Sequence, residues 1–363
     1  MTAFAGLRIA LVGPLAPPAG GMANQTRQLA ELLRAGHASV EMVQTNAPYA
    51  PTWIGRWPGV RAAFRLLPYL LALWRAAARS DVFHVMANSG WAWHLFSAPA
   101  IWIASARRVP VVVNYRGGEA ASFLERSQAI VRWSMKRASA LAVPSRFLEQ
   151  IFLRHGMQPV VLPNIVDLAR FHPRDGSERS SAHVLVARNL EPLYDNQTAL
   201  RAFAQVRPHC PQARLTIAGS GPEEARLREL TAELGLQDCV RFAGLLDRDA
   251  MAALYREADL CLNPSRADNM PNSLLESMAC GVPVVSTNVG GVPFIVEDGK
   301  TALLVAPGDA QAMAAAMLKL LGDAALRSRI AAAGIHEAQR YTWVRVAPVL
   351  ANVYRVAMQP AAR

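Results

Sequence analysis

The chain has 363 residues, of which 52% are hydrophobic and 18% are charged, and its formal net charge is +11. This length exceeds one compact core and predicts two domains, while the composition excludes an intrinsically disordered chain. The four cysteines lie far apart without a C-x-x-C pair, which favours reduced thiols in the cytoplasm over a metal site. The positive charge points to an anionic partner, but no nucleic-acid-binding motif accompanies it.

In the first half of the chain, apolar strand patterns alternate with helical patterns, as in doubly wound α/β domains. The first strand is predicted at 7–13, and we interpret this apolar run as a core strand and not as a signal peptide. A loop containing Gly20 and Gly21 follows, and then a helix that ends at Gly36. Later strands of this half are predicted at 81–87, 109–115 and 140–145.

The segment 53–79 is basic and aromatic. No acidic residue occurs between Met42 and Ser80, and arginines there alternate with tryptophan and leucine. This combination is typical of the surface of an anionic membrane. Its longest apolar run, 66–74, is much shorter than the roughly 20 residues that a membrane span requires. We expect peripheral contact with the inner face of the plasma membrane; the alternative is an ordinary domain helix with solvated arginines.

The second half repeats the α/β alternation after a polar segment, 173–182, which is the predicted linker. Arg188 comes at the end of its first strand, where open α/β sheets bind ligands. Gly219 opens a tight turn after its second strand. The predicted strands are 183–189, 213–219, 239–244, 259–265 and 282–287, and helices are expected near 197–206, 249–258 and from 341 to the end.

The stretch 264–291 combines two carboxylates with a helix start. Asp268 and Glu276 lie eight positions apart around an Asn-Met-Pro-Asn turn, and Gly281 fits the position just past the helix. A proline suits a helix start because its missing N–H would have no partner there. The free amides of the first turn, from about Asn272 to Leu274, form a natural phosphate seat. The pattern predicts a nucleotide-sugar site with these additional donor-binding residues: Asn269, Met270, Pro271, Asn272, Ser273 and Leu274.

This stretch resembles the E-x7-E signature of the retaining family-4 glycosyltransferases, with Asp268 in place of the first Glu. Further stretches resemble that family in the same order along the chain. They are Gly20-Gly21, the loop 114–119, the segment 161–173, Arg188, the turn at Gly219, the loop 288–291 and the final Tyr-Thr-Trp helix.

The resemblance implies the GT-B fold, with two Rossmann-like, doubly wound parallel-sheet domains that face each other across a cleft. We expect an acceptor-binding domain at 1–172, the linker at 173–182 and a nucleotide-sugar-binding domain at 183–340. A C-terminal helix at about 341–358 is expected to pack back on the first domain.

The resemblance also implies site roles. Arg188 would hold the donor diphosphate, Asp268 would orient the sugar and Glu276 would bind the ribose. Two further positions depart from the family pattern: Tyr194 falls near a customary lysine, and Arg116 falls near a customary histidine. We therefore expect Asp268, Arg188 and Arg116 to be the catalytic residues, and Glu276, the 269–274 turn, Gly219, Gly20 and Gly21 to bind the donor. No metal or cofactor is expected.

The implied function is retaining hexosyl transfer from a UDP- or GDP-sugar to a glycan or polyprenol-linked glycan, in cell-envelope or exopolysaccharide synthesis. Three alternatives stay open at this stage. A nucleotide-sugar epimerase of the same fold would need no acceptor, and a non-catalytic relative would bind the nucleotide sugar without transfer. A nucleic-acid-binding protein would explain the charge but not residues 264–291.

Overall fold

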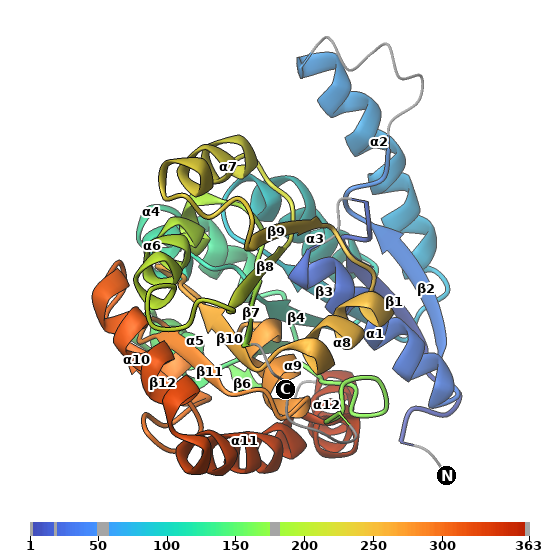
Figure 1. Cartoon of the computed structure of the whole chain (residues 1–363). Coiled ribbons are helices and arrows are strands. Elements are labelled where there is room, and N and C mark those ends of the chain that lie inside the picture. The colour runs from blue at the N-terminus through green and yellow to red at the C-terminus, as the bar shows by residue number, and fades with distance from the viewer. Residues whose placement is uncertain (1–2, 18–19, 49–57, 175–181, 360–363) are drawn as a thin grey trace. The chain divides into compact units, whose positions relative to one another are not determined.

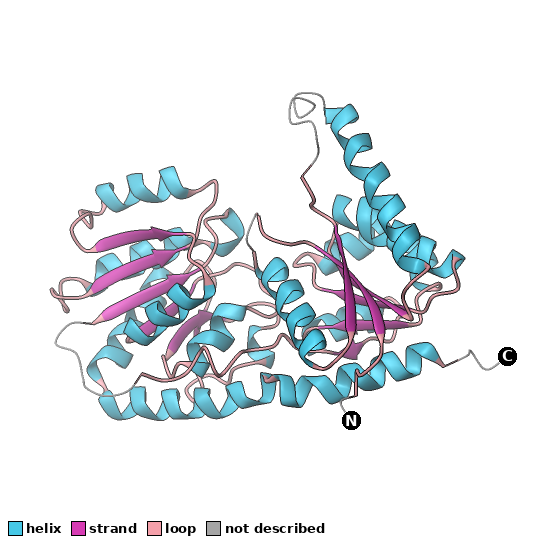
Figure 2. Cartoon of the chain, turned by 90° about the vertical axis from the view of Figure 1, so that its right-hand side faces the viewer, coloured by secondary structure: helices cyan, strands magenta, loops and turns pink. Residues whose placement is uncertain are grey.

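The computed structural model describes residues 3–17, 20–48, 58–174 and 182–359, and only the backbone of 58–63. The chain forms two compact units, one of Met1–Pro163 with Val344–Arg363 and one of Asn164–Trp343. Figure 1 colours the elements by residue number. In each unit, one parallel sheet is accompanied by helices (Figure 2).

The first unit contains a six-stranded sheet with the order β2-β1-β3-β4-β5-β6. Its strands are β1 (Arg8–Gly13), β2 (Ser39–Gln44), β3 (Val82–Ala87), β4 (Val111–Tyr115), β5 (Ala140–Val143) and β6 (Val160–Val161). Its helices are α1 (Gly21–Ala35), α2 (Pro58–Ala77), η2 (Trp93–Ser97), α3 (Ala98–Ala106), α4 (Ala120–Met135) and α5 (Arg146–Arg154). The central strands are buried along their whole length, as expected when helices cover both faces of a parallel sheet.

The second unit contains another six-stranded parallel sheet, with the order β12-β11-β10-β7-β8-β9. Its strands are β7 (His183–Ala187), β8 (Arg214–Ala218), β9 (Val240–Gly244), β10 (Leu260–Asn263), β11 (Val284–Thr287) and β12 (Leu303–Val305). Its helices are η3 (Pro192–Tyr194), α6 (Asn196–Val206), α7 (Glu224–Glu233), α8 (Arg248–Glu257), α9 (Asn272–Ala279), η4 (Val292–Phe294), α10 (Ala310–Gly322), α11 (Ala324–Ala338) and η5 (Gln339–Tyr341). Read by order along the chain, this is the Rossmann arrangement 3-2-1-4-5-6.

The C-terminal helix α12 (Trp343–Met358) belongs to the first unit from Val344 onward. The ring of Tyr354 lies edge-on to Phe4 and to His84, with ring centroids 6.1 and 5.8 Å apart. Tyr354 and His84 are both fully buried. The last helix of the chain is therefore part of the core that its first strands build.

The boundary between the units lies nine residues earlier than the expected end of the first domain at 172. Val166 and Phe171 are buried in the core of the second unit, and the Val166 N–H donates to the carbonyl of Tyr341. Residues 164–172 thus join the second unit because their apolar side chains are buried there. Of the expected linker, 175–181 lie outside the described residues.

Three strands were not predicted: β2, β6 and β12. β2 is an edge strand with mostly half-exposed side chains, and β6 and β12 have only two and three residues. β2 (SVEMVQ) has no continuous apolar run, and the short apolar runs at β6 and β12, 160–162 and 302–306, do not by themselves separate a strand from a buried loop. The other strands lie where the sequence predicted them, within a few residues at each end.

Candidate functional site

The site of the second unit lies where the strand order reverses. β7 and β10 are neighbours in the sheet, and their chain successors run to opposite sides of it. Arg188 follows β7 directly, and the loop 264–271 follows β10. The carboxyl ends of two such strands form the crevice in which open α/β sheets bind ligands. The sequence predicted Arg188 and Asp268 at one site, and the sheet topology places both at this crevice.

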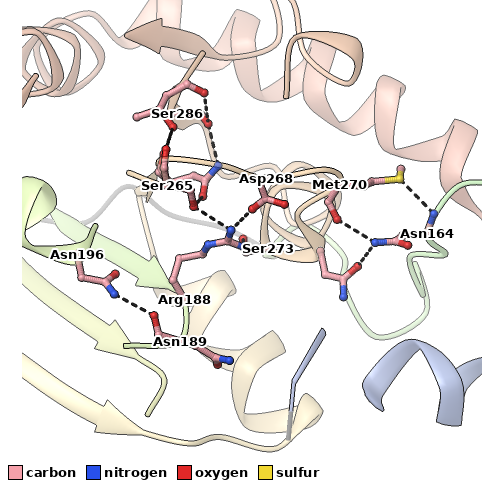
Figure 3. Close-up of polar contacts among 12 residues, drawn as sticks. Asn164, Arg188, Asn189, Asn196, Ser265, Asp268, Met270, Ser273 and Ser286 are labelled. Carbon is pink, nitrogen blue, oxygen red and sulfur yellow. Dashed lines mark hydrogen bonds and ion pairs between the residues drawn. The ribbon is translucent and has the colours of Figure 1, made fainter. Parts of the chain in front are cut away.

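Arg188 and Asp268 form an ion pair through Nη2 and Oδ2, and their side chains are only 9% and 12% exposed (Figure 3). The same Nη2 donates to Ser265 Oγ over 2.8 Å, and Nη1 donates to Ser273 Oγ over 3.4 Å. The guanidinium carbon lies 4.2 Å from the ring centroid of Tyr194. Arg188 is therefore held by an ion pair, two hydroxyls and an aromatic face.

One hydrogen-bond donor of Arg188 lacks a partner among the described residues. The Nε of Arg188 is buried and has no hydrogen-bond partner among the residues that the structure describes. A buried, unpaired donor on a cation is costly unless a ligand completes it. An anionic ligand at the end of β7 would supply that partner.

Ser265 is anchored by a buried polar chain that the sequence analysis did not predict. Its hydroxyl donates to Asn263 Oδ1 over 2.9 Å, and Asn263 Nδ2 donates to Ser286 Oγ over 2.9 Å (Figure 3). All three residues are buried. This series of hydrogen bonds links the ends of β10 and β11 to the guanidinium of Arg188. It therefore holds the guanidinium in place with little freedom to reorganise.

The turn 269–274 is tied to the start of the second unit. Asn164 donates from Nδ2 to the carbonyl of Met270 over 2.9 Å and to Asn272 Oδ1 over 2.7 Å (Figure 3). Pro271 caps the N-terminus of α9, and Gly281 follows its end with φ +68°. One expectation was wrong: the Leu274 amide is not free, because it bonds to the Pro271 carbonyl over 3.2 Å.

Two glycine loops pack closely on the site backbone. A Cβ on Gly291 would lie 1.8 Å from the carbonyl oxygen of Asn269, and the Gly291 N–H donates to the carbonyl of Asp268. A Cβ on Gly219 would lie 2.1 Å from the carbonyl oxygen of Arg188. Only glycine allows these approaches. Gly219 therefore stands beside the backbone of Arg188, and the loop at 290–291 supports that of Asp268.

Glu276 lies within α9 and is half-buried. Tyr255, a fully buried residue of α8, donates from Oη to Glu276 Oε2 over 3.2 Å. Burial raises the pKa of Glu276 to about 7, against the opposing effects of the nearby Arg248 charge and the Tyr255 hydrogen bond. A carboxyl group poised near neutral pH is typical of a ligand-binding position.

The first unit carries the remaining predicted residues. Gly20 caps α1 with an extended φ of −170°, and a Cβ there would meet nothing within 4 Å, so its conformation does not require glycine. Gly21 is the first residue of α1. Arg116 follows β4, and its Nε donates to Asn114 Oδ1 over 3.2 Å. Burial lowers the pKa of Arg116 to about 10, which leaves it a cation at neutral pH.

Sequence reasoning missed several residues that hold this site. Tyr194 was noted only as a replaced lysine, whereas its ring stacks on Arg188. Asn164 and Tyr255 contact the 270–276 segment from positions far away in the chain. Only Ser265 had a local signal, since it follows a buried strand immediately before the predicted site.

A Rossmann sheet with a helix N-terminus at its switch point is typical of nucleotide-binding proteins. Family models identify the class further. Residues 182–323 match the model for glycosyl transferases group 1, and residues 20–164 match that for the glycosyl transferase 4-like domain. The chain belongs to the group 1 glycosyltransferases of the GT4 type.

Curated relatives include D-inositol 3-phosphate glycosyltransferases. The protein of Streptomyces bingchenggensis is 31% identical over 233 residues, covering 58% of this chain and 51% of that protein. The protein of Frankia alni is 35% identical over 220 residues, covering 56% and 54%. The chain thus spans about half the length of the curated relatives it matches.

Solved structures match nearly the whole chain. Sucrose-phosphate synthase from Thermosynechococcus elongatus is similar with a TM-score of 0.78 and 23% identity, covering 96% of this chain and 98% of that one. Anabaena HepE in complex with UDP-glucose is similar with a TM-score of 0.74 and 21% identity, covering 96% and 99%. The two parallel-sheet units have the GT-B fold.

Proposed function

We propose that the protein is a retaining glycosyltransferase that moves a hexose from a UDP- or GDP-sugar to a glycan or polyprenol-linked glycan. The acceptor would belong to a bacterial cell envelope or exopolysaccharide. The observation that carries this proposal is the cluster of Arg188, Asp268 and Ser273 at the switch point of the second sheet. Family membership and the similarity to a structure holding UDP-glucose support it.

In this proposal, Arg188 stabilises the departing diphosphate. Its Nε is the donor without a partner among the described residues, and its other nitrogens are already fixed by Asp268 and two serines. A cation that is held in place before the reaction stabilises developing charge without a cost of reorganisation. The proposal therefore needs no metal at the leaving group.

The two carboxylates are proposed to have separate roles. Asp268 uses Oδ2 for Arg188, and the proposal assigns its Oδ1 to hydroxyl groups of the donor sugar. Glu276 is proposed to accept hydrogen bonds from the ribose diol, which an ionised carboxylate can do with both oxygens. Binding of the diol would favour the charged form of Glu276 over the protonated form that burial favours.

A transfer assay tests the proposal. Purified protein is incubated with UDP-glucose, GDP-mannose or ADP-glucose and a polyprenol-linked glycan extract, with and without EDTA, and products are analysed by mass spectrometry and NMR. We expect one donor class to give a glycosylated product with the anomeric configuration of the donor, unaffected by EDTA. An isomerised donor without acceptor would indicate an epimerase, and binding without turnover a non-catalytic relative. Inversion or loss with EDTA would refute the mechanism.

We also propose that α2 contacts an anionic membrane. One stripe of this helix is apolar and exposed: Phe64, Leu67, Leu71 and Trp74 are 47%, 62%, 57% and 50% exposed. The opposite side, with Leu73 and Ala76, is buried. In both views the N-terminal part of α2 stands away from the sheet of its own unit (Figures 1 and 2). An exposed apolar stripe of this kind marks an interaction surface.

Charge favours a lipid surface as the partner. The Arg107 guanidinium lies 4.7 Å from the Trp74 ring centroid, and Arg75 is exposed on the same helix. Arg79, by contrast, is paired with Glu41 over 2.7 Å. The described helices contain none that is long and apolar enough to cross a membrane. Residues 53–57 of the segment predicted to contact the membrane lie outside the described residues.

Vesicle co-sedimentation tests this surface. We expect binding to phosphatidylglycerol vesicles and weak binding to phosphatidylcholine, and we expect Leu67→Glu with Leu71→Glu to abolish the former. Leu245→Glu is the matched control, because Leu245 is 56% exposed on the second unit. Equal loss in this control, or binding that survives the α2 variant, would contradict the proposal.

A further inference from the structure

A chain of hydrogen bonds runs through the first unit from Arg116 to the C-terminal helix. Arg116 Nε bonds Asn114 Oδ1 over 3.2 Å, Asn114 Nδ2 lies 3.1 Å from His84 Nε2, and His84 Nδ1 lies 2.8 Å from Tyr354 Oη. Asn114, His84 and Tyr354 are each 0% exposed. Their hydrogen bonds are therefore shielded from water, where a polar network is both strong and sensitive to the loss of a member.

The direction of each bond follows from Arg116. A guanidinium only donates, so the atom of Asn114 that faces it must be the carbonyl oxygen. The amide NH2 of Asn114 then faces His84 and donates to Nε2, which must be unprotonated. A neutral imidazole carries its single proton on the other nitrogen, so Nδ1–H donates to the oxygen of Tyr354. Arg116 thus determines the tautomer of His84 through the amide of Asn114, which lies between them.

The imidazolium form does not fit this arrangement. A proton on Nε2 would point at the NH2 group of Asn114. Burial and the nearby Arg116 charge lower the pKa of His84 to about 3, so the ring is neutral at physiological pH. Burial also raises the pKa of Tyr354 well above its ordinary value, which keeps its hydroxyl protonated.

We propose that Tyr354, His84 and Asn114 are positioning residues that orient the guanidinium of Arg116, so that the C-terminal helix controls a substrate-binding group at the end of β4. The functional part of this inference rests on the proposed glycosyltransferase activity, in which Arg116 contacts the sugar or an anionic acceptor. The chain of bonds itself does not depend on that activity.

Loss of the Tyr354 hydroxyl has a defined consequence. In Tyr354→Phe, the buried Nδ1–H of His84 has lost its acceptor, which disfavours the native tautomer. The opposite tautomer carries a proton on Nε2 and needs an acceptor from Asn114. The amide of Asn114 must then turn over, which presents its NH2 group to Arg116 and removes the oxygen that holds the guanidinium. The effect is transmitted to Arg116 without any direct contact between the two residues.

A spectroscopic experiment tests the chain of bonds directly. Long-range 1H–15N NMR of the wild-type protein should show His84 protonated on Nδ1 and not on Nε2. In Tyr354→Phe, the Arg116 Nε–H signal should shift or broaden through exchange with water. Tyr69→Phe is the matched control, because Tyr69 is a buried tyrosine of the same unit that donates to the Phe96 carbonyl over 2.8 Å. Protonated Nε2 in the wild type, or an unchanged Arg116 signal in Tyr354→Phe, would overturn the proposal whether or not the protein transfers sugars.

Kinetics then test the functional consequence. We expect Tyr354→Phe to lower kcat by about tenfold, with donor KM unchanged, as a misplaced substrate-binding group does. Tyr69→Phe should lose similar thermal stability and keep its kcat. Arg116→Ala with Tyr354→Phe should be no slower than Arg116→Ala alone, because Tyr354 acts through Arg116. Additive losses in the double variant would refute this role for Tyr354.

Discussion

Arg188 and Arg116, the two arginines expected to take part in catalysis, are held in opposite ways. Arg188 of the second unit is fixed by a carboxylate, two hydroxyls and an aromatic ring, most of which lie within a few residues of two strand ends. Arg116 of the first unit is oriented by a neutral amide, and behind it by His84 and Tyr354, which are 270 residues apart. Arg188 is held by its ion pair with Asp268, whereas the orientation of Arg116 depends on which groups donate and which accept in the hydrogen bonds behind it.

This contrast predicts different costs of substitution. Removal of one member of a buried ion pair leaves a buried charge without its partner, so both stability and chemistry suffer. Removal of one member of the neutral chain changes the direction of a bond and affects chemistry more than stability.

Arg188→Ala should have the largest effect. We expect kcat to fall by about 10²- to 10³-fold, as when a preorganised charge-stabilising donor is removed. The free energy of unfolding should also fall by about 3 kcal/mol, because Asp268 is left buried without its cation. Steady-state kinetics and urea unfolding measure the two effects.

Arg188→Met combined with Asp268→Leu separates these two effects. Apolar side chains of similar size in place of a buried pair should restore stability but not activity. Activity in the double variant would show that Arg188 is not needed for catalysis. Full stability in Arg188→Ala would show that the ion pair does not stabilise the protein. Either result would remove the contrast with Arg116.

Glu276→Gln should change how nucleotide binding depends on pH. The pKa of Glu276 is about 7 in the folded protein, and the ribose hydroxyls are proposed to bind the ionised form. Affinity of the wild type for its nucleotide should therefore rise about tenfold between pH 6 and pH 8, as the carboxyl group loses its proton. Calorimetric titration at both pH values measures this. The variant should bind weakly at both, and a wild-type-like rise in it would exclude Glu276 as the titrating group.

The stability of the free protein should change in the opposite sense. The folded protein keeps the Glu276 proton up to about pH 7, whereas the unfolded chain loses it near the ordinary value of 4.5. The folded state then binds more protons between these values, so its stability falls as pH rises through that window. In Glu276→Gln this contribution is absent, and thermal melts at pH 5 and pH 8 compare the two proteins.

Tyr194→Ala should have the smallest effect. Loss of the aromatic face under Arg188 removes about 1 kcal/mol of cation–π attraction, equivalent to about a fivefold loss in kcat/KM. Tyr194→Phe keeps the ring and serves as the control, so it should remain close to wild type. Equal losses in both variants would assign the effect to the hydroxyl group and not to the stacked ring.

The same contrast explains what the sequence could predict. Asp268, Pro271 and Glu276 lie in one short segment, so local pattern sufficed to place them at one helix start, whereas their roles in binding stay predictions. Arg188 was predicted because strand ends gather at one edge of a parallel sheet. The other residues that hydrogen-bond around each arginine are distant in the sequence, and strand order and core packing bring them together.

Particular residues show why those partners could not be predicted. Asn164 contacts Met270 across 106 positions, and His84 contacts Tyr354 across 270, so no local pattern connects either pair. His84 is a fully buried core histidine whose hydrogen bonds all reach residues far away in the sequence. The expectation of a free amide at Leu274 was wrong, because this N–H donates to the carbonyl of Pro271 in the first turn of α9.

The most direct test of the account is calorimetric titration of UDP, GDP and ADP into the wild type, Arg188→Ala and Arg116→Ala. The account predicts that UDP or GDP binds the wild type, that Arg188→Ala binds it at least about tenfold more weakly, and that Arg116→Ala binds it like the wild type. Equal affinity in the wild type and Arg188→Ala, or binding of none of the three nucleotides by the wild type, would contradict the assignment of the second-unit site.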